Sequence, residues 1–240
     1  MCIRDRHRSE FFFCNFNDGK DYNDLLEEQA PYEDFLMENE LQYNRINLLP
    51  IWDNDAEYDY IMWGNWPSGQ DQYTEWGAYM NDYPKWAEEN DLPPQNVGDC
   101  EKGALSMRFH SLLRLRVPMD ERDERMFTDW RRCKLTDDAS ITDLKALYAK
   151  QEKLAKDFGL SGYGVSMFTP YRGNQMETDW DFLMMTHWYN TESRVDLISS
   201  FRGWRDVLLD SGIMDERSKH IESCSEADTY QSHMIYNTHK

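Results

Sequence analysis

The sequence predicts an α+β fold in which two tandem copies of a β-α-β-β-α-β unit pack sheet to sheet as a barrel. Four stretches in the first half of the chain align, in order, with stretches about 120 residues later, and this indicates an internal duplication. Strand-like and helix-like periodicities follow one another in the same order in both halves. The 9 Trp, 14 Tyr and 11 Phe residues supply the aromatic surface that a folded core needs.

The duplication rests on matched residues whose separation grows slowly along the chain, as short insertions in loops would cause. The segment 57–62 aligns with 179–184, and the single matched residues are Cys14 with Cys133, Tyr43 with Tyr163, Pro50 with Pro170, Trp66 with Trp188, and Cys100 with Cys224. The alignment predicts a first repeat at 7–117, a charged connector at 118–125 and a second repeat at 126–240. Residues 1–6 (Met-Cys-Ile-Arg-Asp-Arg) match the translation of a transposon end used as a sequencing adapter. We interpret them as an artefact, excluded from the fold, that truncates the first strand and removes any signal peptide.

The first strand and the first helix of each repeat are recognised by composition and by end signals. Strand one is expected at 11–16 and at 126–135. Helix one of the second repeat begins with a capping box, Ser140 to Asp143, and ends at Gly159. Its counterpart at 21–37 is a poorer helix, which Pro31 is expected to interrupt.

The remaining elements follow in the same order. Strand two is expected at 42–49 and 162–169, each closed by its matched proline, and the aromatic-rich strand three at 58–65 and 180–188. Helix two follows Ser68 in one half and Thr191 in the other. Strand four is expected at 105–113 and 228–236. The apolar faces expected for the two copies of helix two are Tyr73, Trp76, Met80 and Tyr83 in the first and Ile198, Phe201, Trp204 and Leu208 in the second.

This element order is that of the ferredoxin-like unit, with helices on one face of a four-stranded antiparallel sheet. The other face must also be covered, because an exposed apolar sheet face is an aggregation site. With its strand-three sequence Tyr-Asp-Tyr-Ile-Met-Trp-Gly-Asn-Trp-Pro at 58–67, the chain resembles the dimeric α+β barrel superfamily in a fused two-repeat form. That superfamily includes the NIPSNAP, EthD-like and antibiotic-biosynthesis monooxygenase groups.

The resemblance implies a small-molecule enzyme or binder that uses the cavity between the sheets, such as a cofactor-independent oxygenase. The alternative is a non-catalytic structural or interaction module whose core is filled. A small-molecule ligand is the expected partner, and the chain is expected to act as a monomer or a homodimer. No cofactor is expected, with haem as the alternative.

The cysteines other than Cys2 form two equivalent pairs, and the repeat favours disulfides between Cys14 and Cys100 and between Cys133 and Cys224. Disulfides imply an oxidising compartment, either the periplasm or the outside of the cell. The alternative is four reduced core cysteines in a cytoplasmic protein. A zinc site is not favoured, because the sequence has no CxxC or HxxxH spacing.

Polar groups near the ends of strands are the candidates for a site. His187 aligns with Asn65 at the end of strand three, where a barrel would open. His187 and Asn65, together with nearby aromatic rings, would orient a small apolar or aromatic ligand. The alternative is that these rings only fill the core. His110 and His233 lie in the two fourth strands and would be haem ligands or general bases inside the barrel, or ordinary strand histidines. The candidate rings are Tyr60, Trp63, Trp66 and Trp188.

Acidic residues are interpreted as structural or solvated. Asp59 and Asp181 could act as paired carboxylates, but strand alternation favours an outward position for both. The chain has 26 Lys+Arg against 45 Asp+Glu, a formal net charge of −19, which excludes nucleic acid as a partner. No apolar run is long enough for a transmembrane helix. Phosphate-binding glycine loops, GxSxG and HExxH motifs are absent.

Overall fold

The computed structural model describes residues 7–52, 56–100, 104–172 and 179–238. The segment 1–6, interpreted above as an artefact, lies outside these ranges. The first-half elements are β1 (Arg8–Phe16), α1 (Tyr22–Glu38), β2 (Asn44–Trp52), β3 (Tyr60–Trp66), α2 (Gly69–Asn81), α3 (Tyr83–Glu89), β4 (Gly98–Asp99) and β5 (Ala104–Leu115). After the short 3-10 helix η2 (Met119–Glu121) come β6 (Arg125–Leu135), α4 (Ile141–Phe158), β7 (Tyr163–Arg172), β8 (Phe182–Trp188), α5 (Thr191–Asp210), α6 (Ile213–Ser218), β9 (Ile221–Cys224) and β10 (Asp228–Asn237).

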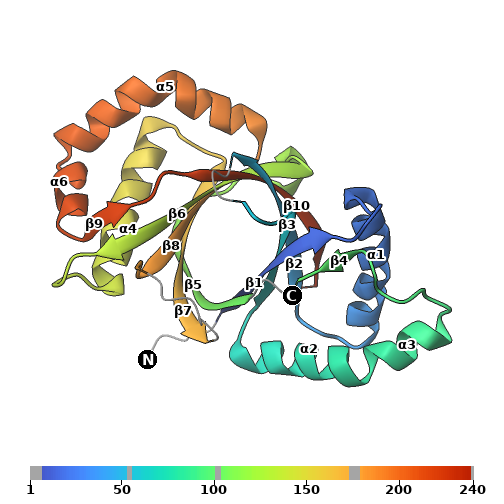
Figure 1. The fold of residues 1–240 in the computed structure, drawn as a ribbon. Coiled ribbons are helices and arrows are strands. Elements are labelled where there is room, and N and C mark those ends of the chain that lie inside the picture. Colours follow the sequence, from blue (N-terminus) through green and yellow to red (C-terminus); the bar gives the residue numbers. More distant parts are fainter. Residues whose placement is uncertain (1–6, 53–55, 101–103, 173–178, 239–240) are drawn as a thin grey trace.

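The main strands close into a single antiparallel barrel (Figure 1). The strand order is β2-β3-β1-β5 in the first half and β7-β8-β6-β10 in the second. Strand β5 also pairs with β7, and β10 also pairs with β2. Two separate sheets packed face to face were expected, and this is wrong because the two halves join edge to edge in one sheet. Closure gives the backbone groups of these edge strands partners and leaves no open edge in the ring.

The helices lie outside the barrel in two groups, with α1, α2 and α3 on one side and α4, α5 and α6 on the other (Figure 1). The second group covers an apolar layer that includes Leu144, Leu147 and Trp204, all 5% exposed or less. The corresponding layer in the first half is more polar and more aromatic, with Tyr32, Tyr43 and Trp66 in its core. None of the helices in the described part of the chain is long and apolar enough to cross a membrane.

The helix-end signals in the sequence agree with the structure. Ser140 and Asp143 form a reciprocal capping box at the start of α4, and Gly159 ends that helix with a φ of 87°, a conformation that favours glycine. Asp21 and Asp24 form the same kind of box before α1. The expected interruption of α1 is wrong, since the helix continues through Pro31. One face of α1, with Leu25 and Phe35 buried, holds the helix against the sheet and offsets the hydrogen bond that the proline removes.

Removal of the α4 cap gives a modest, testable loss of stability. The Ser140 hydroxyl accepts the Asp143 N–H at 3.3 Å, so Ser140→Ala is expected to lower the free energy of unfolding by about 1 kcal/mol. Urea unfolding at neutral pH measures this change, and Ser140→Thr, which keeps the hydroxyl, is the control. An unchanged midpoint for Ser140→Ala would show that the cap does not stabilise the helix.

The matched prolines do not close the second strands, contrary to expectation. Pro50 lies inside β2 and Pro170 inside β7. The pairing register shifts between Thr229 and Tyr230 opposite the first, and between Ser106 and Met107 opposite the second. A bulge of this kind accommodates a residue that lacks a backbone N–H donor, so each strand continues past its proline.

The expected apolar faces of α2 and α5 are also partly wrong. Tyr73 and Met80 of α2 are 53% and 60% exposed, while Gln72 and Glu75 of the same helix are buried. Glu75 is buried because its carboxylate accepts hydrogen bonds from the Tyr32 hydroxyl and from Trp66 Nε1, and this offsets the cost of removing it from water. Of the residues expected on the equivalent face of α5, Ile198 and Phe201 are exposed and Trp204 is buried.

Both predicted disulfides are present. Cys14 bonds to Cys100 and Cys133 to Cys224, with Cα–Cα distances of 4.0 and 4.1 Å. Each bridge joins the end of the first strand of one half to a position at the short strand that pairs with it, β4 or β9. The cross-links close loops with sequence separations of 86 and 91 residues.

Candidate functional site

The interior of the barrel is filled at one end and hollow at the other. Large side chains such as Phe11, Trp130 and Phe168, all 2% exposed or less, fill the closed end. The other end holds a cavity of about 540 Å³. Its walls come from every barrel strand except β1, together with His7, Arg116, Arg122 and Tyr189 from adjoining segments. A volume of this size is typical of small-molecule sites.

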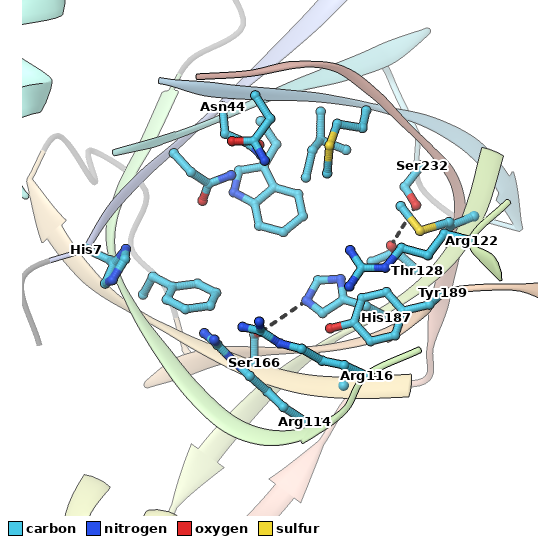
Figure 2. A pocket seen from close by; sticks show the side chains of 18 of the residues that line it. His7, Asn44, Arg114, Arg116, Arg122, Thr128, Ser166, His187, Tyr189 and Ser232 are labelled. Carbon is cyan, nitrogen blue, oxygen red and sulfur yellow. Dashed lines mark hydrogen bonds between the residues drawn. The ribbon is translucent and has the colours of Figure 1, made fainter. Parts of the chain in front are cut away.

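His187 lies in the wall of this cavity at the end of β8 (Figure 2). Its ring stacks on Trp63, with centroids 5.4 Å apart and an interplanar angle of 16°. Its Nε2 lies 3.1 Å from Ser166 Oγ. Burial and, to a smaller extent, the nearby Arg114 lower the pKa of His187 to about 4. The imidazole is therefore neutral at pH 7 and offers one donor and one acceptor.

Asn65 and Trp63 also line the cavity, as the sequence analysis suggests for the end of strand three. Asn65 Oδ1 accepts a hydrogen bond from Ser9 Oγ at 2.5 Å. Trp63 is 4% exposed and contacts Phe11 and Phe168 as well as His187. The site thus has a rigid aromatic wall, and a polar amide lies beside it.

The other three candidate rings lie outside the barrel, which corrects their assignment to its mouth. Successive side chains of a strand point to opposite faces, so Trp63 points inward while Tyr60 and Trp66 face the first-half helices. Trp188, next to the inward His187, likewise belongs to the outer apolar layer. Trp66 Nε1 donates to Glu75, and Trp188 Nε1 donates to Asp129 Oδ2 at 3.0 Å.

Tyr60 instead borders a second cavity, of about 500 Å³, between the first-half helices and the outer face of the sheet. The Arg45 guanidinium enters the same space and donates to the Tyr43 hydroxyl at 2.7 Å and to Met62 Sδ. This cavity is separate from the barrel interior, since the two share no lining residue.

His110 and His233 do not line the barrel cavity either, so the structure agrees with the alternative of ordinary strand histidines and not with that of ligands or bases inside the barrel. Each is a strand residue that points to the outer face while its neighbours, Phe109 in one case and Ser232 in the other, line the cavity. His110 Nε2 lies 3.1 Å from Thr169 Oγ1. His233 Nδ1 lies 2.9 Å from the Tyr22 hydroxyl.

Asp59 and Asp181 are exposed and hold the ends of strands, as their outward assignment predicts. Asp59 Oδ2 accepts the backbone N–H of Phe16, and Asp181 Oδ2 accepts that of Leu135, both at 2.8 Å. The two carboxylates therefore have equivalent structural roles in the two halves, and neither lines the cavity.

Three arginines that the sequence analysis did not single out reach the cavity: Arg114, Arg116 and Arg122 (Figure 2). Arg114 is the second-to-last residue of β5 and Arg116 follows it by two residues, so both project toward the cavity while the intervening Leu115 is buried in the outer layer. Arg122 comes from the connector and stacks over the Tyr189 ring at 4.7 Å. The alternation Leu-Arg-Leu-Arg at 113–116 is the signal that could have revealed them.

The lining of this cavity is positively charged although the protein is acidic. Among the described residues that line it there is no Asp or Glu, whereas the whole chain has a formal net charge of −19. Burial and the neighbouring Arg116 lower the pKa of Arg114. Cations that crowd together in a concave, partly apolar space raise the local concentration of anions.

None of the three histidines considered as haem ligands fits that role inside the barrel. Of the three candidate histidines only His187 lines the cavity, and its ring is covered by Trp63 while its Nε2 is directed to Ser166. An iron ligand must present a ring nitrogen to open space. Within the described ranges, no three His, Cys, Asp or Glu side chains gather as a metal site would require.

Comparisons with known proteins identify the fold and no closer relationship. No family model matches the sequence, and no curated protein does. Two solved structures resemble the chain at TM-scores just above 0.5. The first is a candidate monooxygenase from Lactobacillus acidophilus, with a TM-score of 0.52, 7% identity and coverage of 98% of this chain and 97% of the other. The second, a chlorite dismutase variant from Candidatus Nitrospira defluvii with bound cyanide, gives 0.51, 10% identity and coverage of 98% and 96%.

An anthrone oxidase-like protein matches over 99% of this chain and 97% of its own, with a TM-score of 0.49 and 12% identity. The two neighbours with TM-scores above 0.5 have α+β barrel-like folds. The chain therefore has an α+β barrel fold with a large antiparallel sheet. At such low identity the neighbours' activities and ligands do not transfer to it.

Proposed function

We propose that this protein binds a small, flat, partly apolar molecule inside the barrel, in the cavity against Trp63 and His187. The observation that supports this most directly is a cavity of about 540 Å³ where a protein with a purely structural role would have a packed interior. Phe109, Met126 and Met234 add apolar surface, and Ser166, Thr128 and Ser232 add hydroxyls. A mostly apolar space with a few placed polar groups is the usual composition of such a site.

We further propose that the chain is a fused pair of ferredoxin-like repeats. Both halves have the same element order and the same internal strand order. The two disulfides and the two strand-end aspartates, Asp59 and Asp181, occupy equivalent places. The disulfides also favour an oxidising compartment, such as the periplasm or the extracellular space, as the place where the protein works.

The proposed binding site is tested with 2-naphthamide, a flat and uncharged probe. Phe109→Ala is expected to weaken its binding roughly tenfold or more in calorimetric titration, because the variant removes an apolar wall of the site. Phe201→Ala, which truncates a ring that is 56% exposed on α5, is the matched control and is expected to bind as the wild type does.

The same titration followed by NMR locates the probe. The indole N–H signal of Trp63, assigned by its loss in Trp63→Phe, is expected to shift on binding, while that of Trp204, outside the barrel, stays in place. If Phe109→Ala and Phe201→Ala bound the probe equally and the Trp63 signal did not shift, the barrel cavity would be excluded as the site.

A further inference from the structure

Among the described residues that line the barrel cavity, no carboxylate neutralises its positive charges. The Glu152 carboxylate of α4, which interacts with Arg114 from outside this lining, accepts the Arg114 backbone N–H at 3.0 Å and pairs with Lys156. No ion pair within the described part of the chain joins Arg114, Arg116 or Arg122 to an acidic side chain. Other arginines of the protein do have such partners, as Arg194 has in Asp129 and Arg132 in Asp228. The absence of carboxylates is therefore local to the cavity.

Acidic residues beside the cluster are engaged elsewhere. Asp123, adjacent to Arg122, accepts hydrogen bonds from the Thr191 backbone N–H and hydroxyl, both at 2.7 Å. Glu124 faces His233, at 3.3 Å, on the outside of the barrel. The Asp123 contacts hold the connector against the start of α5, the Glu124 contact holds it against β10, and Arg122 is directed to the cavity (Figure 2).

Two of the three guanidiniums, those of Arg114 and Arg122, are held in place by neutral groups. Arg114 Nε donates to Ser111 Oγ at 2.5 Å. Arg122 Nη2 donates to the carbonyl oxygen of Val117 at 3.4 Å, and the guanidinium stacks on Tyr189 at 4.7 Å. Neutral contacts orient the guanidiniums without satisfying their charge, so a bound anion would gain charge-assisted hydrogen bonds from groups that are already positioned.

We infer that the ligand of the barrel cavity is an aromatic carboxylate. This inference rests on the proposed function and specifies its ligand class. The flat ring lies against Trp63 and Phe109, and the carboxylate is bound by Arg114, Arg116 and Arg122, which converge on the open space opposite Asn44 (Figure 2). A planar guanidinium fork matches the geometry of a carboxylate. The connector between the two halves, which supplies Arg122, is thereby part of the binding site.

The test compares 2-naphthoate with 2-naphthamide, two probes with the same ring and nearly the same size but different charge. Calorimetric titration of the wild type is expected to show at least about tenfold tighter binding of 2-naphthoate, because charge-assisted hydrogen bonds are stronger than neutral ones. The preference is expected to decrease between 20 mM and 500 mM salt as screening increases.

The variants assign the preference to the cluster. Arg116→Gln with Arg122→Gln is expected to remove it while 2-naphthamide still binds. The control is Arg202→Gln with Arg205→Gln, which neutralises two exposed arginines of α5. It changes the net charge by the same amount and is expected to keep the preference for 2-naphthoate. If the first double variant does not fold, the salt dependence in the wild type still tests the inference.

Each other outcome has a distinct meaning. Equal binding of the two probes, with the Trp63 signal shifted by both, would overturn the inference and leave the proposed function standing. Binding of neither probe would overturn both. A 2-naphthoate preference that survives Arg116→Gln with Arg122→Gln would place the anion site elsewhere and overturn the inference. Tenfold tighter binding of 2-naphthyl phosphate than of 2-naphthoate would also overturn it, in favour of an organic phosphate.

Discussion

Replacement of all four disulfide cysteines by alanine is expected to lower the free energy of unfolding by about 4 to 8 kcal/mol. Each bridge closes a long loop, with separations of 86 and 91 residues, and a bridge of this kind typically contributes about 2 to 4 kcal/mol. The sum is comparable with the whole stability of an ordinary domain, about 5 to 15 kcal/mol. The variant is therefore expected to unfold in mild denaturant or to be unfolded without it, as measured by circular dichroism in urea.

The two single-bridge variants provide the internal control. Loop-closure entropy depends only on the logarithm of loop length, so the bridges are expected to differ by less than about 0.1 kcal/mol through this effect. Cys14→Ala with Cys100→Ala should then cost the same as Cys133→Ala with Cys224→Ala. A large inequality would assign the extra loss to packing around one bridge. Unchanged urea midpoints in both variants would show that neither bridge stabilises the fold.

The cysteine pairs and the order of helices and strands could be predicted because they depend on order along the chain. Matching Cys14 to Cys133 and Cys100 to Cys224 restricts the pairing without any knowledge of distances. The capping box at Ser140 and the terminal Gly159 are equally local. These helix-end signals depend on a few neighbouring residues, and tertiary contacts did not override them.

Closure of the barrel and the direction of several side chains could not be predicted. Nothing local in β5 or β10 shows that they pair with β7 and β2, since an edge strand and a paired strand have similar composition. Trp63 and Trp66 are both tryptophans of one strand, and only the strand register decides that Trp63 faces the cavity. Glu75 is buried on a helix face that hydrophobicity alone assigns to solvent, because its partners Tyr32 and Trp66 come from other elements.

The arginine cluster was missed for a different reason. Arg114 and Arg116 alternate with leucines in a pattern that is visible in the sequence, but Arg122 lies in a connector whose charges suggest a solvated linker. The fold brings the connector to the mouth of the barrel, where Arg122 meets Tyr189. A charged segment between the two halves of the chain therefore contributes to the site only because the barrel closes beside it.

Two buried titratable groups are expected to give the stability opposite dependences on pH. Glu10 of β1 is 9% exposed and accepts a hydrogen bond from Gln72 at 2.8 Å. Its pKa is raised from 4.5 to about 7, mainly by burial. Between these values the folded protein holds a proton that the unfolded chain releases, so the free energy of unfolding falls as the pH rises. For His187, with its pKa lowered from 6.5 to about 4, the unfolded chain holds the extra proton, and the free energy of unfolding rises with pH.

In the wild type these two slopes oppose each other between about pH 4.5 and 6.5, so variants are needed to separate them. The free energy of unfolding of Glu10→Gln is expected to rise, relative to that of the wild type, by up to about 3 kcal/mol between pH 4.5 and 7.5. Each unit of pKa shift corresponds to about 1.4 kcal/mol. The free energy of unfolding of His187→Asn is expected to fall by a similar amount, relative to that of the wild type, between pH 4 and 6.5. Urea unfolding at each pH measures both, with Glu27→Gln, an exposed position on α1, as the control. Curves that run parallel to wild type would show that burial inside this fold does not perturb the two groups.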